Sequence, residues 1–279
     1  MSGRNASLKT DMKNKAIGIF DSGIGGLTVA NAIQHRLPSE SLVYFGDTAH
    51  MPYGDKSPEL IRHYTARITA FLLEQKVKMV VIACNTASSH AFQTVQDLCG
   101  PGIPVINVID PVVDVVSAKY KTGKIGVIGT KGTMASRVYP RRIQKKNSKL
   151  KVVSQATPLL APMIEEGFFN NNISKTVIES YLSKPLFEDL DALILGCTHY
   201  PLIKREVRNY FGKKVHVIDS ASVVAASIED VLREKGMLNN QVNDPEYTFL
   251  VSDHTESFER STRLFFKKRI HLGEARLWE

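Results

Sequence analysis

Two cysteines, Cys84 and Cys197, each follow a short apolar run and precede hydroxyl and amide side chains. The runs span 79–83 and 192–196, and each is typical of a buried strand that ends at a turn. A thiol has an ordinary pKa of about 8.5, so it can accept or donate a proton near neutral pH. Two thiols on opposite faces of one carbon would invert it, one removing a proton and the other returning one. The pattern therefore favours racemisation or epimerisation by two bases.

A simpler interpretation of a single buried cysteine is a small core residue. Cys99 fits that interpretation, because it ends a predicted helix and has no counterpart elsewhere in the chain. Cys84 and Cys197 share a context, which favours a shared chemical role. A zinc site is not expected, because the chain has no paired Cys-x-x-Cys framework. We predict neither a metal nor a cofactor. The sequence does not exclude pyridoxal phosphate, because the lysine that binds it has no fixed sequence spacing.

Short apolar runs alternate with stretches of helical length along the whole chain. The runs predict strands at 16–20, 41–45, 77–83, 104–108, 124–128, 150–155, 191–195, 214–218 and 246–251. The intervening stretches predict helices at 25–36, 57–75, 87–98, 110–119, 173–184, 201–210, 220–236 and 255–267. The strands lack a polar face, so we expect an α/β fold with mainly parallel sheets flanked by helices. Ligands bind such sheets at the carboxyl ends of the strands, where both cysteines lie.

The two halves of the chain begin alike. The string at 16–23 resembles the string at 124–131, and a cysteine follows each string at a similar distance. This similarity favours an internal duplication and a pseudo-symmetric pair of domains. We place the first domain at 16–110 plus 221–279 and the second at 111–220.

The composition is ordinary for a soluble globular protein, with 43% apolar and 23% charged residues among 279. No apolar run approaches the roughly eighteen residues needed to cross a bilayer, so no membrane contact is expected. Residues 1–15 lack the apolar core of a signal peptide. Three cysteines are an odd count in a chain that needs no disulfide, which favours reduced thiols and a cytoplasmic location.

The net charge of +8 raises the question of a nucleic-acid partner. The basic residues are grouped in short, scattered runs at 141–146, 213–214 and 267–269. These runs have no interleaved aromatic platform and belong to no recognisable nucleic-acid motif. We interpret them as solvated surface and expect no nucleic-acid partner.

Four motifs make the assignment more specific. They are FDSGIGGLTV at 20–29, PYG at 52–54, ACNTAS at 83–88 and GCTHYP at 196–201. Together, in this order and along nearly the whole chain, they resemble the motifs of glutamate racemases, a family of cofactor-independent amino-acid racemases. The resemblance implies two pseudo-symmetric α/β domains with the active site in the cleft between them. It also implies interconversion of L- and D-glutamate for peptidoglycan and the cell wall, and a homodimer.

By the same resemblance, Cys84 and Cys197 are the proton-transfer residues. His199 follows Cys197 by two positions and could polarise that thiol or share its proton. Similar sequences place an assisting carboxylate near Glu165. The alternative interpretation is that Glu165 is an exposed residue at the end of a helix. The predicted catalytic residues are Cys84, Cys197, Asp21, Glu165 and His199.

Several polar residues of the motifs are candidates for substrate binding. Asp21 and Ser22 begin a glycine-rich turn whose backbone amides suit a carboxylate. Asp21 could hold the substrate ammonium or orient Cys84, and its alternative role is to cap the next helix. Only the resemblance gives 52–54 a role beyond a turn. The predicted substrate-binding residues are Asp21, Ser22, Pro52, Tyr53, Gly54, Asn85, Thr86, Thr198 and His199.

Three other functions remain open from the sequence. Aspartate racemase is the nearest, because the pocket depth that selects chain length is not visible in a sequence. A thiol hydrolase with Cys197 as nucleophile and His199 as base is the second, and it leaves Cys84 without a role. A DNA-binding or regulatory protein is the third, and salt-dependent binding without turnover would support it.

Overall fold

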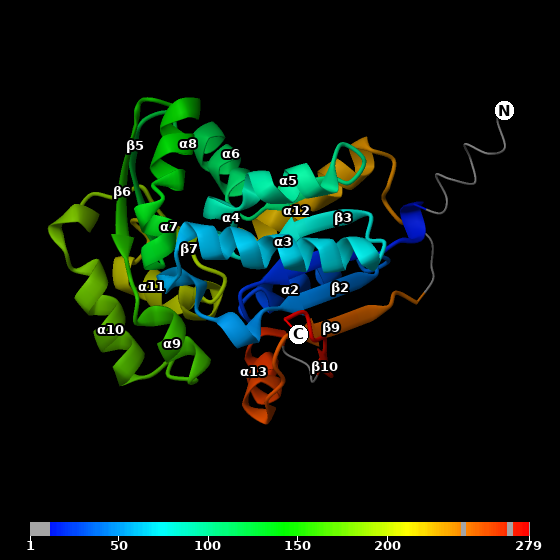
Figure 1. Cartoon of the computed structure of the whole chain (residues 1–279). Helices are drawn as coiled ribbons and strands as arrows, with labels where there is room; N and C mark the ends of the chain where they lie inside the picture. The colour runs from blue at the N-terminus through cyan, green and yellow to red at the C-terminus, as the bar shows by residue number, and fades with distance from the viewer. Residues whose placement is uncertain (1–11, 241–243, 267–269, 279) are drawn as a thin grey trace.

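The computed structural model of the chain describes residues 12–240, 244–266 and 270–278. Its strands form two parallel sheets that lie side by side (Figure 1). The first sheet has the order β10-β9-β2-β1-β3-β4, and the second has the order β6-β5-β7-β8. Residues 1–11 of the polar N-terminal segment and the basic run at 267–269, with the last residue of the helix predicted at 255–267, lie outside the described ranges.

The strands lie close to the predicted runs. They are β1 Ile17–Asp21, β2 Leu42–Gly46, β3 Met79–Ile82, β4 Val105–Asn107, β5 Gly123–Gly129, β6 Leu150–Ala156, β7 Ala192–Gly196, β8 His216–Asp219, β9 Tyr247–Val251 and β10 Gly273–Glu274. The two-residue strand β10 was not predicted, because a segment this short carries no periodic signal. The α/β class and the parallel sheets are confirmed.

Helices cover both faces of the sheets. The α-helices are α2 Leu27–Arg36, α3 Pro58–Glu74, α4 Asn85–His90, α5 Phe92–Cys99, α6 Asp110–Lys119, α7 Lys131–Ala135, α8 Val138–Lys146, α9 Leu160–Glu165, α10 Asn172–Leu182, α11 Lys204–Phe211, α12 Ser220–Glu234 and α13 Glu256–Phe266. The short 3-10 helices are η1 Thr48–His50, η2 Tyr53–Asp55, η3 Pro185–Phe187 and η4 Tyr200–Ile203. No helix among the described residues is long and apolar enough to span a membrane.

Some helix boundaries differ from the prediction. The helix predicted at 87–98 is two helices, α4 and α5, with a break at Ala91. The helix predicted at 201–210 begins as η4 and continues as α11. The short helices α7, α8 and α9 were not predicted, because α8 is strongly basic and α7 and α9 span fewer than two turns. The basic run at 141–146 lies on α8, where its basic side chains are exposed or half-buried and Ile143 is buried.

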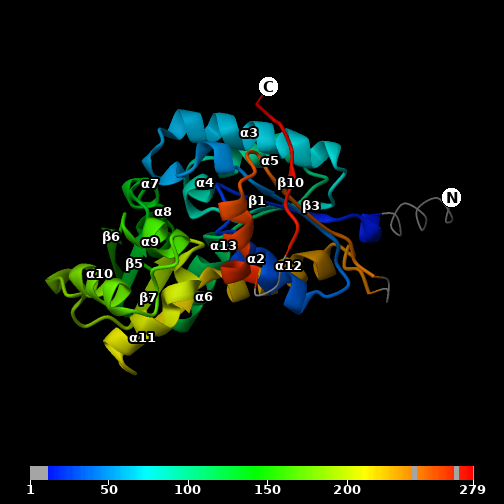
Figure 2. The ribbon, with the colours of Figure 1, turned by 90° about the horizontal axis from the view of Figure 1, so that it is seen from below.

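The apolar strands are explained by packing on both of their faces. Figure 2 shows the first sheet between α3 and α5 on one side and α2 and α12 on the other. In β1, Ile19 belongs to a core that continues into the second half of the molecule, and Phe20 belongs to the core beneath α3. Because neither face of the strand is exposed to solvent, a strand that alternated polar and apolar residues would bury its polar groups.

Both halves contain the same four-stranded unit. The order β2-β1-β3-β4 in the first sheet matches β6-β5-β7-β8 in the second, and every pairing within both units is parallel. The similar strings noted in the sequence fall on β1 and β5, which hold the second position in the spatial order of their units. The duplication is therefore visible in the topology. The first sheet also receives β9 and β10 from the end of the chain, and the predicted domain boundaries stay a prediction.

Candidate active site

The two thiols line one small cavity of about 170 Å3 at the carboxyl ends of β3 and β7. Its walls are formed by Ser22, Gly23, Met51, Pro52, Tyr53, Gly54, Cys84, Asn85, Thr86, Thr130, Ala161, Pro162, Glu165, Cys197, Thr198 and His199. All predicted site residues except Asp21 are in this wall. The Asp21 side chain is fully buried, and it lies behind the turn that carries Ser22. Segments that are far apart in the sequence thus form one candidate site.

Cys84 lies at the first turn of α4, where its Sγ accepts a hydrogen bond from the Ala87 N–H at 3.4 Å. Ser22 Oγ lies 3.5 Å from the same sulfur. Burial and, secondarily, the negative charge of Asp21 raise the pKa of the Cys84 thiol to about 12. The Cys84 thiol is therefore protonated at neutral pH in the free protein.

Asp21 ends β1 and folds back onto the turn that follows. Its Oδ2 accepts hydrogen bonds from Gly26 N–H at 2.9 Å and Gly23 N–H at 3.2 Å. Oδ1 is buried, with no hydrogen-bond partner in the described part of the chain. Burial raises the pKa of this carboxyl, while the nearby His199 and the backbone N–H groups lower it in part. Asp21 does not cap α2, which begins at Leu27 without a side-chain cap; it binds two N–H groups of the turn that precedes this helix.

Cys197 follows β7 and is paired with a histidine. The Cys197 Sγ lies 3.6 Å from His199 Nδ1, and His199 Nε2 lies 2.8 Å from Glu165 Oε1. Burial alone would lower the pKa of His199, but the hydrogen bonds and negative charges of Cys197 and Glu165 raise it well above its ordinary value. The imidazole is therefore held in its charged form, where it stabilises a thiolate on Cys197.

The two halves meet at the glycine-rich turn. A methyl group on Gly25 would lie 2.4 Å from two ring atoms of His199 and 2.7 Å from Thr198 Oγ1. Thr28 Oγ1 lies 2.9 Å from the Thr198 carbonyl oxygen and donates to it. Glycine at position 25 therefore lets the first half approach the Cys197 side closely enough to hold His199 in place.

Polar groups of the cavity wall are fixed by residues that the sequence did not single out. Tyr139 donates a hydrogen bond to Asn85 Oδ1 at 2.7 Å. The Asn85 Nδ2 group is buried without a partner in the residues described, so it is a free donor at the wall. Thr86 Oγ1 lies 2.8 Å from Thr130 Oγ1, which joins α4 to the turn before α7. A signal for Thr130 existed, because it takes the place of Ser22 when the two similar strings are aligned.

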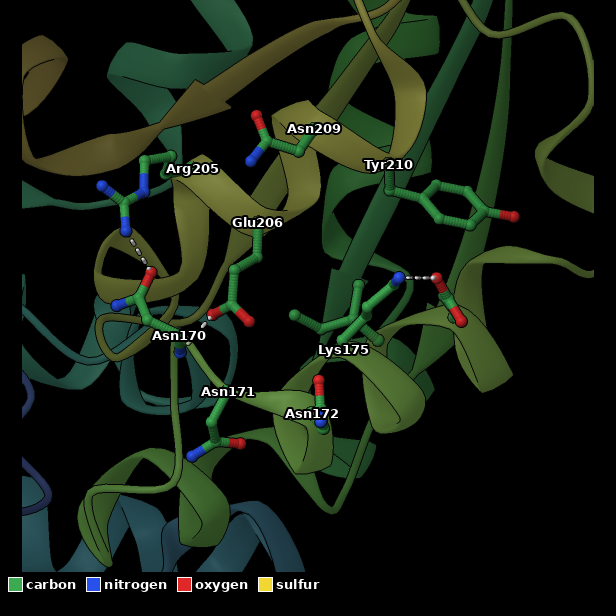
Figure 3. Close-up of a pocket in the computed structure, with 10 residues that line it drawn as sticks. Asn170, Asn171, Asn172, Lys175, Arg205, Glu206, Asn209 and Tyr210 are labelled. Atoms are coloured by element: carbon green, nitrogen blue, oxygen red, sulfur yellow. Dashed lines mark hydrogen bonds and ion pairs between the residues drawn. The ribbon is translucent and has the colours of Figure 1, made fainter.

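A larger hollow of about 770 Å3 lies between α10 and α11 (Figure 3). Apart from Ile178 and Tyr210, its side chains are amides and charged groups, several of which bind one another. Arg205 donates to Asn170 Oδ1 at 2.9 Å, and the Asn170 N–H donates to Glu206 Oε2 at 3.0 Å. This hollow contains neither a thiol nor any predicted site residue. The chemistry of the side chains therefore favours the smaller cavity as the active site.

Among the described residues, no group of three or more His, Cys, Asp and Glu side chains is placed to hold a metal ion. All three cysteines are free thiols.

Comparison with known proteins extends along nearly the whole chain. Residues 27–228 match a family model described as Asp/Glu/Hydantoin racemase. A glutamate racemase of Chlorobaculum tepidum is 42% identical over 249 residues, which cover 89% of this chain and 91% of that protein. The crystal structure of a glutamate racemase from Francisella tularensis with D-glutamate superposes with a TM-score of 0.89 and 39% identity, covering 95% and 99% of the two chains. A Bacillus anthracis glutamate racemase isoform gives 0.87 and 36%, covering 94% and 98%.

Proposed function

Because the chain belongs to the Asp/Glu/hydantoin racemase family, we propose that it interconverts L- and D-glutamate by proton transfer between two cysteines. The observation that carries the proposal is the single cavity lined by both Cys84 and Cys197. The similarity to glutamate racemases at about 40% identity supports the choice of glutamate over aspartate. The enzyme is thus an isomerase that acts on a small molecule.

In this mechanism one thiolate removes the α-hydrogen of glutamate as a proton. The electron pair stays on the α-carbon, and the thiol on the other side gives its proton to the opposite face. The product leaves one cysteine protonated and the other deprotonated, the reverse of the starting state. Because the charged His199 lies 3.6 Å from Cys197 and the Cys84 thiol keeps its proton, we assign the first proton removal to Cys197.

The α-hydrogen of an amino acid is a very weak acid, so the cavity must stabilise the developing carbanion. Each tenfold in rate requires about 1.4 kcal/mol of differential stabilisation, which fixed donors in a dry cavity can supply. The free Asn85 Nδ2, the hydroxyls of Thr86 and Thr130 and the turn at Ser22 are suited to the two substrate carboxylates. Thr198 is suited to the same role on the Cys197 side. Asp21 is fully buried behind the cavity wall, so of its two predicted roles we propose the influence on Cys84 and not a contact with the substrate ammonium.

The remaining predictions rest on the resemblance to glutamate racemases. They are a supply of D-glutamate for peptidoglycan, a homodimer and catalysis without a cofactor. The prediction of a cytoplasmic location rests instead on the cysteine usage. The two halves that form the cavity come from different sheets, so a hinge between them is a further proposal for substrate entry.

The test is incubation with L-glutamate in deuterium oxide without added cofactor. We expect inversion of optical rotation with deuterium at the α-carbon, and loss of inversion in Cys84→Ser and Cys197→Ser. Exchange that persists in one variant would assign the surviving cysteine to one face. No exchange with either glutamate enantiomer would overturn the proposal, and aspartate would be tested next.

One rival receives support from a specific contact. Cys197, His199 and Glu165 are arranged like the nucleophile, base and orienting carboxylate of a thiol hydrolase. The two functions differ in their need for Cys84. A hydrolase would keep its activity in Cys84→Ser and would trap an acyl group on Cys197, whereas a racemase would do neither.

A further inference from the structure

A buried carboxylate outside the cavity holds the loop that forms one of its walls. Asp47 follows β2, and its side chain is completely buried. Its Oδ2 accepts a hydrogen bond from the Tyr53 hydroxyl at 2.6 Å, and its Oδ1 accepts one from the Ser252 hydroxyl at 2.8 Å. His50 Nδ1 lies 2.9 Å from the same Oδ1. One carboxylate thus gathers three side chains from η1, η2 and the end of β9.

The loop held by Asp47 reaches the cavity directly. Met51, Pro52, Tyr53 and Gly54 all line it, although the Tyr53 side chain is only 1% exposed. The Tyr53 ring is therefore an anchor, and its less buried neighbours Met51, Pro52 and Gly54 form the accessible part of this wall. On the opposite side the loop touches the second half of the molecule. A methyl group on Gly54 would lie 2.8 Å from Thr130 Cβ.

The rest of the loop is fixed to the same frame. The Asp47 N–H donates to the Asp21 carbonyl oxygen at 3.0 Å, which ties it to the end of β1. Thr48 Oγ1 donates to the Asp253 carbonyl oxygen at 2.6 Å and accepts from the Asp253 N–H at 3.0 Å. The loop is thus held by β1 and by the segment after β9, and Asp47 links both of these to the Tyr53 hydroxyl.

We infer that Asp47 is a positioning residue for substrate binding, which sets the Tyr53–Gly54 wall of the cavity through the Tyr53 hydroxyl. This inference rests on the proposed racemase function. Asp47 has no contact with the cavity, so its loss should change how substrate binds more than how the proton moves. An amide at this position has one acceptor oxygen for three donors, and one of the three contacts must weaken.

The test compares Asp47→Asn, Tyr53→Phe and the double variant. We expect KM for glutamate to rise about tenfold in each single variant, as for loss of a hydrogen bond to a buried charge, with kcat within about threefold of wild type. The double variant should be no worse than the more affected single variant, because both changes break the same contact. A multiplied effect, or a fall in kcat with unchanged KM, would overturn the inference.

The opposite end of β2 offers a matched control. Glu40 is also a buried carboxylate, and it pairs with Lys78 at 2.5 Å at the end of the sheet away from the thiols. Glu40→Gln should lower the free energy of unfolding without changing KM. If Glu40→Gln raises KM as much as Asp47→Asn does, the effect is general loss of stability and the inference fails.

A second readout does not depend on turnover. Hydrogen–deuterium exchange of the backbone amides at 48–56 should become faster in Asp47→Asn and Tyr53→Phe and stay unchanged in Glu40→Gln. An unchanged rate at 48–56 in Asp47→Asn would contradict the positioning role. If the wild type fails to racemise glutamate, the proposed function falls by itself, whatever the exchange experiment shows.

Discussion

The two thiols occupy equivalent places in two copies of one fold, yet their surroundings differ in charge. Cys84 lies beside a buried carboxyl, and burial together with that carboxyl raises its pKa to about 12. Cys197 lies 3.6 Å from a histidine whose own pKa is raised by Cys197 and Glu165. Both thiols are 5% exposed and line the same cavity. The two thiols therefore differ in the charges of their neighbours and not in their exposure to solvent.

The source of the asymmetry can be found by aligning the two units. Thr86 and His199 both stand two residues after their cysteine, and Asp21 corresponds to Gly129 at the end of the equivalent strand. Each half therefore carries one charged residue beside its thiol, Asp21 or His199, at a position where the other half has a neutral residue. We call these two residues the charged assistants. A symmetric backbone places the two thiols, and in the proposed mechanism the two unmatched side chains prepare one as acid and the other as base.

The largest effect is expected from removing these two assistants. His199→Asn and Asp21→Asn should each lower kcat by about 10²- to 10³-fold, the range of a lost acid–base assistant. Because the two enantiomers have equal free energy, kcat/KM must fall equally in both directions. The asymmetry should appear in the primary isotope effect, which should rise for one α-deuterated enantiomer in His199→Asn and for the other in Asp21→Asn. A rise for the same enantiomer in both variants would show that the assistants do not serve separate thiols.

Gly25→Ala tests whether the close contact between the halves positions His199. The new methyl group would lie 2.4 Å from the ring, so the imidazole must move away from Cys197 or the halves must separate. We expect kcat/KM to fall about 10²-fold, a typical result of a displacement of about 1 Å at a catalytic group. Gly100→Ala is a control for the general effect of removing a glycine, since it has a positive φ and lies in open space at the end of α5. Equal losses in the two variants would contradict the argument.

Alkylation compares the thiols without turnover. At pH 8 a thiol with a pKa of about 12 is almost fully protonated, and only the thiolate reacts. Iodoacetamide should therefore modify Cys197 at least about tenfold faster than Cys84, as measured by peptide mass spectrometry. Cys99, whose pKa burial raises to about 11, is the internal standard for a thiol without a charged partner. Faster labelling of Cys84 than of Cys197 would reverse the assignment of acid and base.

The smallest effect is expected from Glu165→Gln, which keeps the shape of the contact with His199 and removes its charge. We expect a loss of about fivefold in kcat/KM at neutral pH, the equivalent of about 1 kcal/mol. Glu165 helps to raise the pKa of His199, so the alkaline limb of the pH–rate profile should move to lower pH. A profile that does not move would show that Glu165 has no influence on the imidazole.

The same pair makes a prediction about stability. The folded pKa of His199 lies above its unfolded value, so the charged imidazole stabilises the folded state fully below about pH 6.5. This contribution should be lost as the pH rises through the folded pKa. Denaturant unfolding of wild type and Glu165→Gln should therefore differ most at low pH, down to the pH where Glu165 itself is protonated, and converge at high pH.

The sequence identified the elements well where a strong local pattern existed. The apolar runs located the main strands, because strands buried on both faces admit few polar residues. Helix breaks such as Ala91 were missed, because the same residues satisfy a helical period on both sides of the break. Thr130, Tyr139 and Asp47 were missed as well. Their importance comes from contacts with Thr86, Asn85 and Tyr53, and two of the three contacts join different halves of the molecule.

The sequence by itself determined the α/β class, the duplicated unit and the pairing of the two thiols with strand ends, since each depends on residue type and spacing along the chain. Only the tertiary structure decided which groups act on each thiol. It buried Asp21 behind the turn and left its Oδ1 without a partner, and it brought Glu165 to His199 across 34 positions of sequence. Burial and the distances between charges set these pKa values, and both quantities exist only once the two halves have packed together.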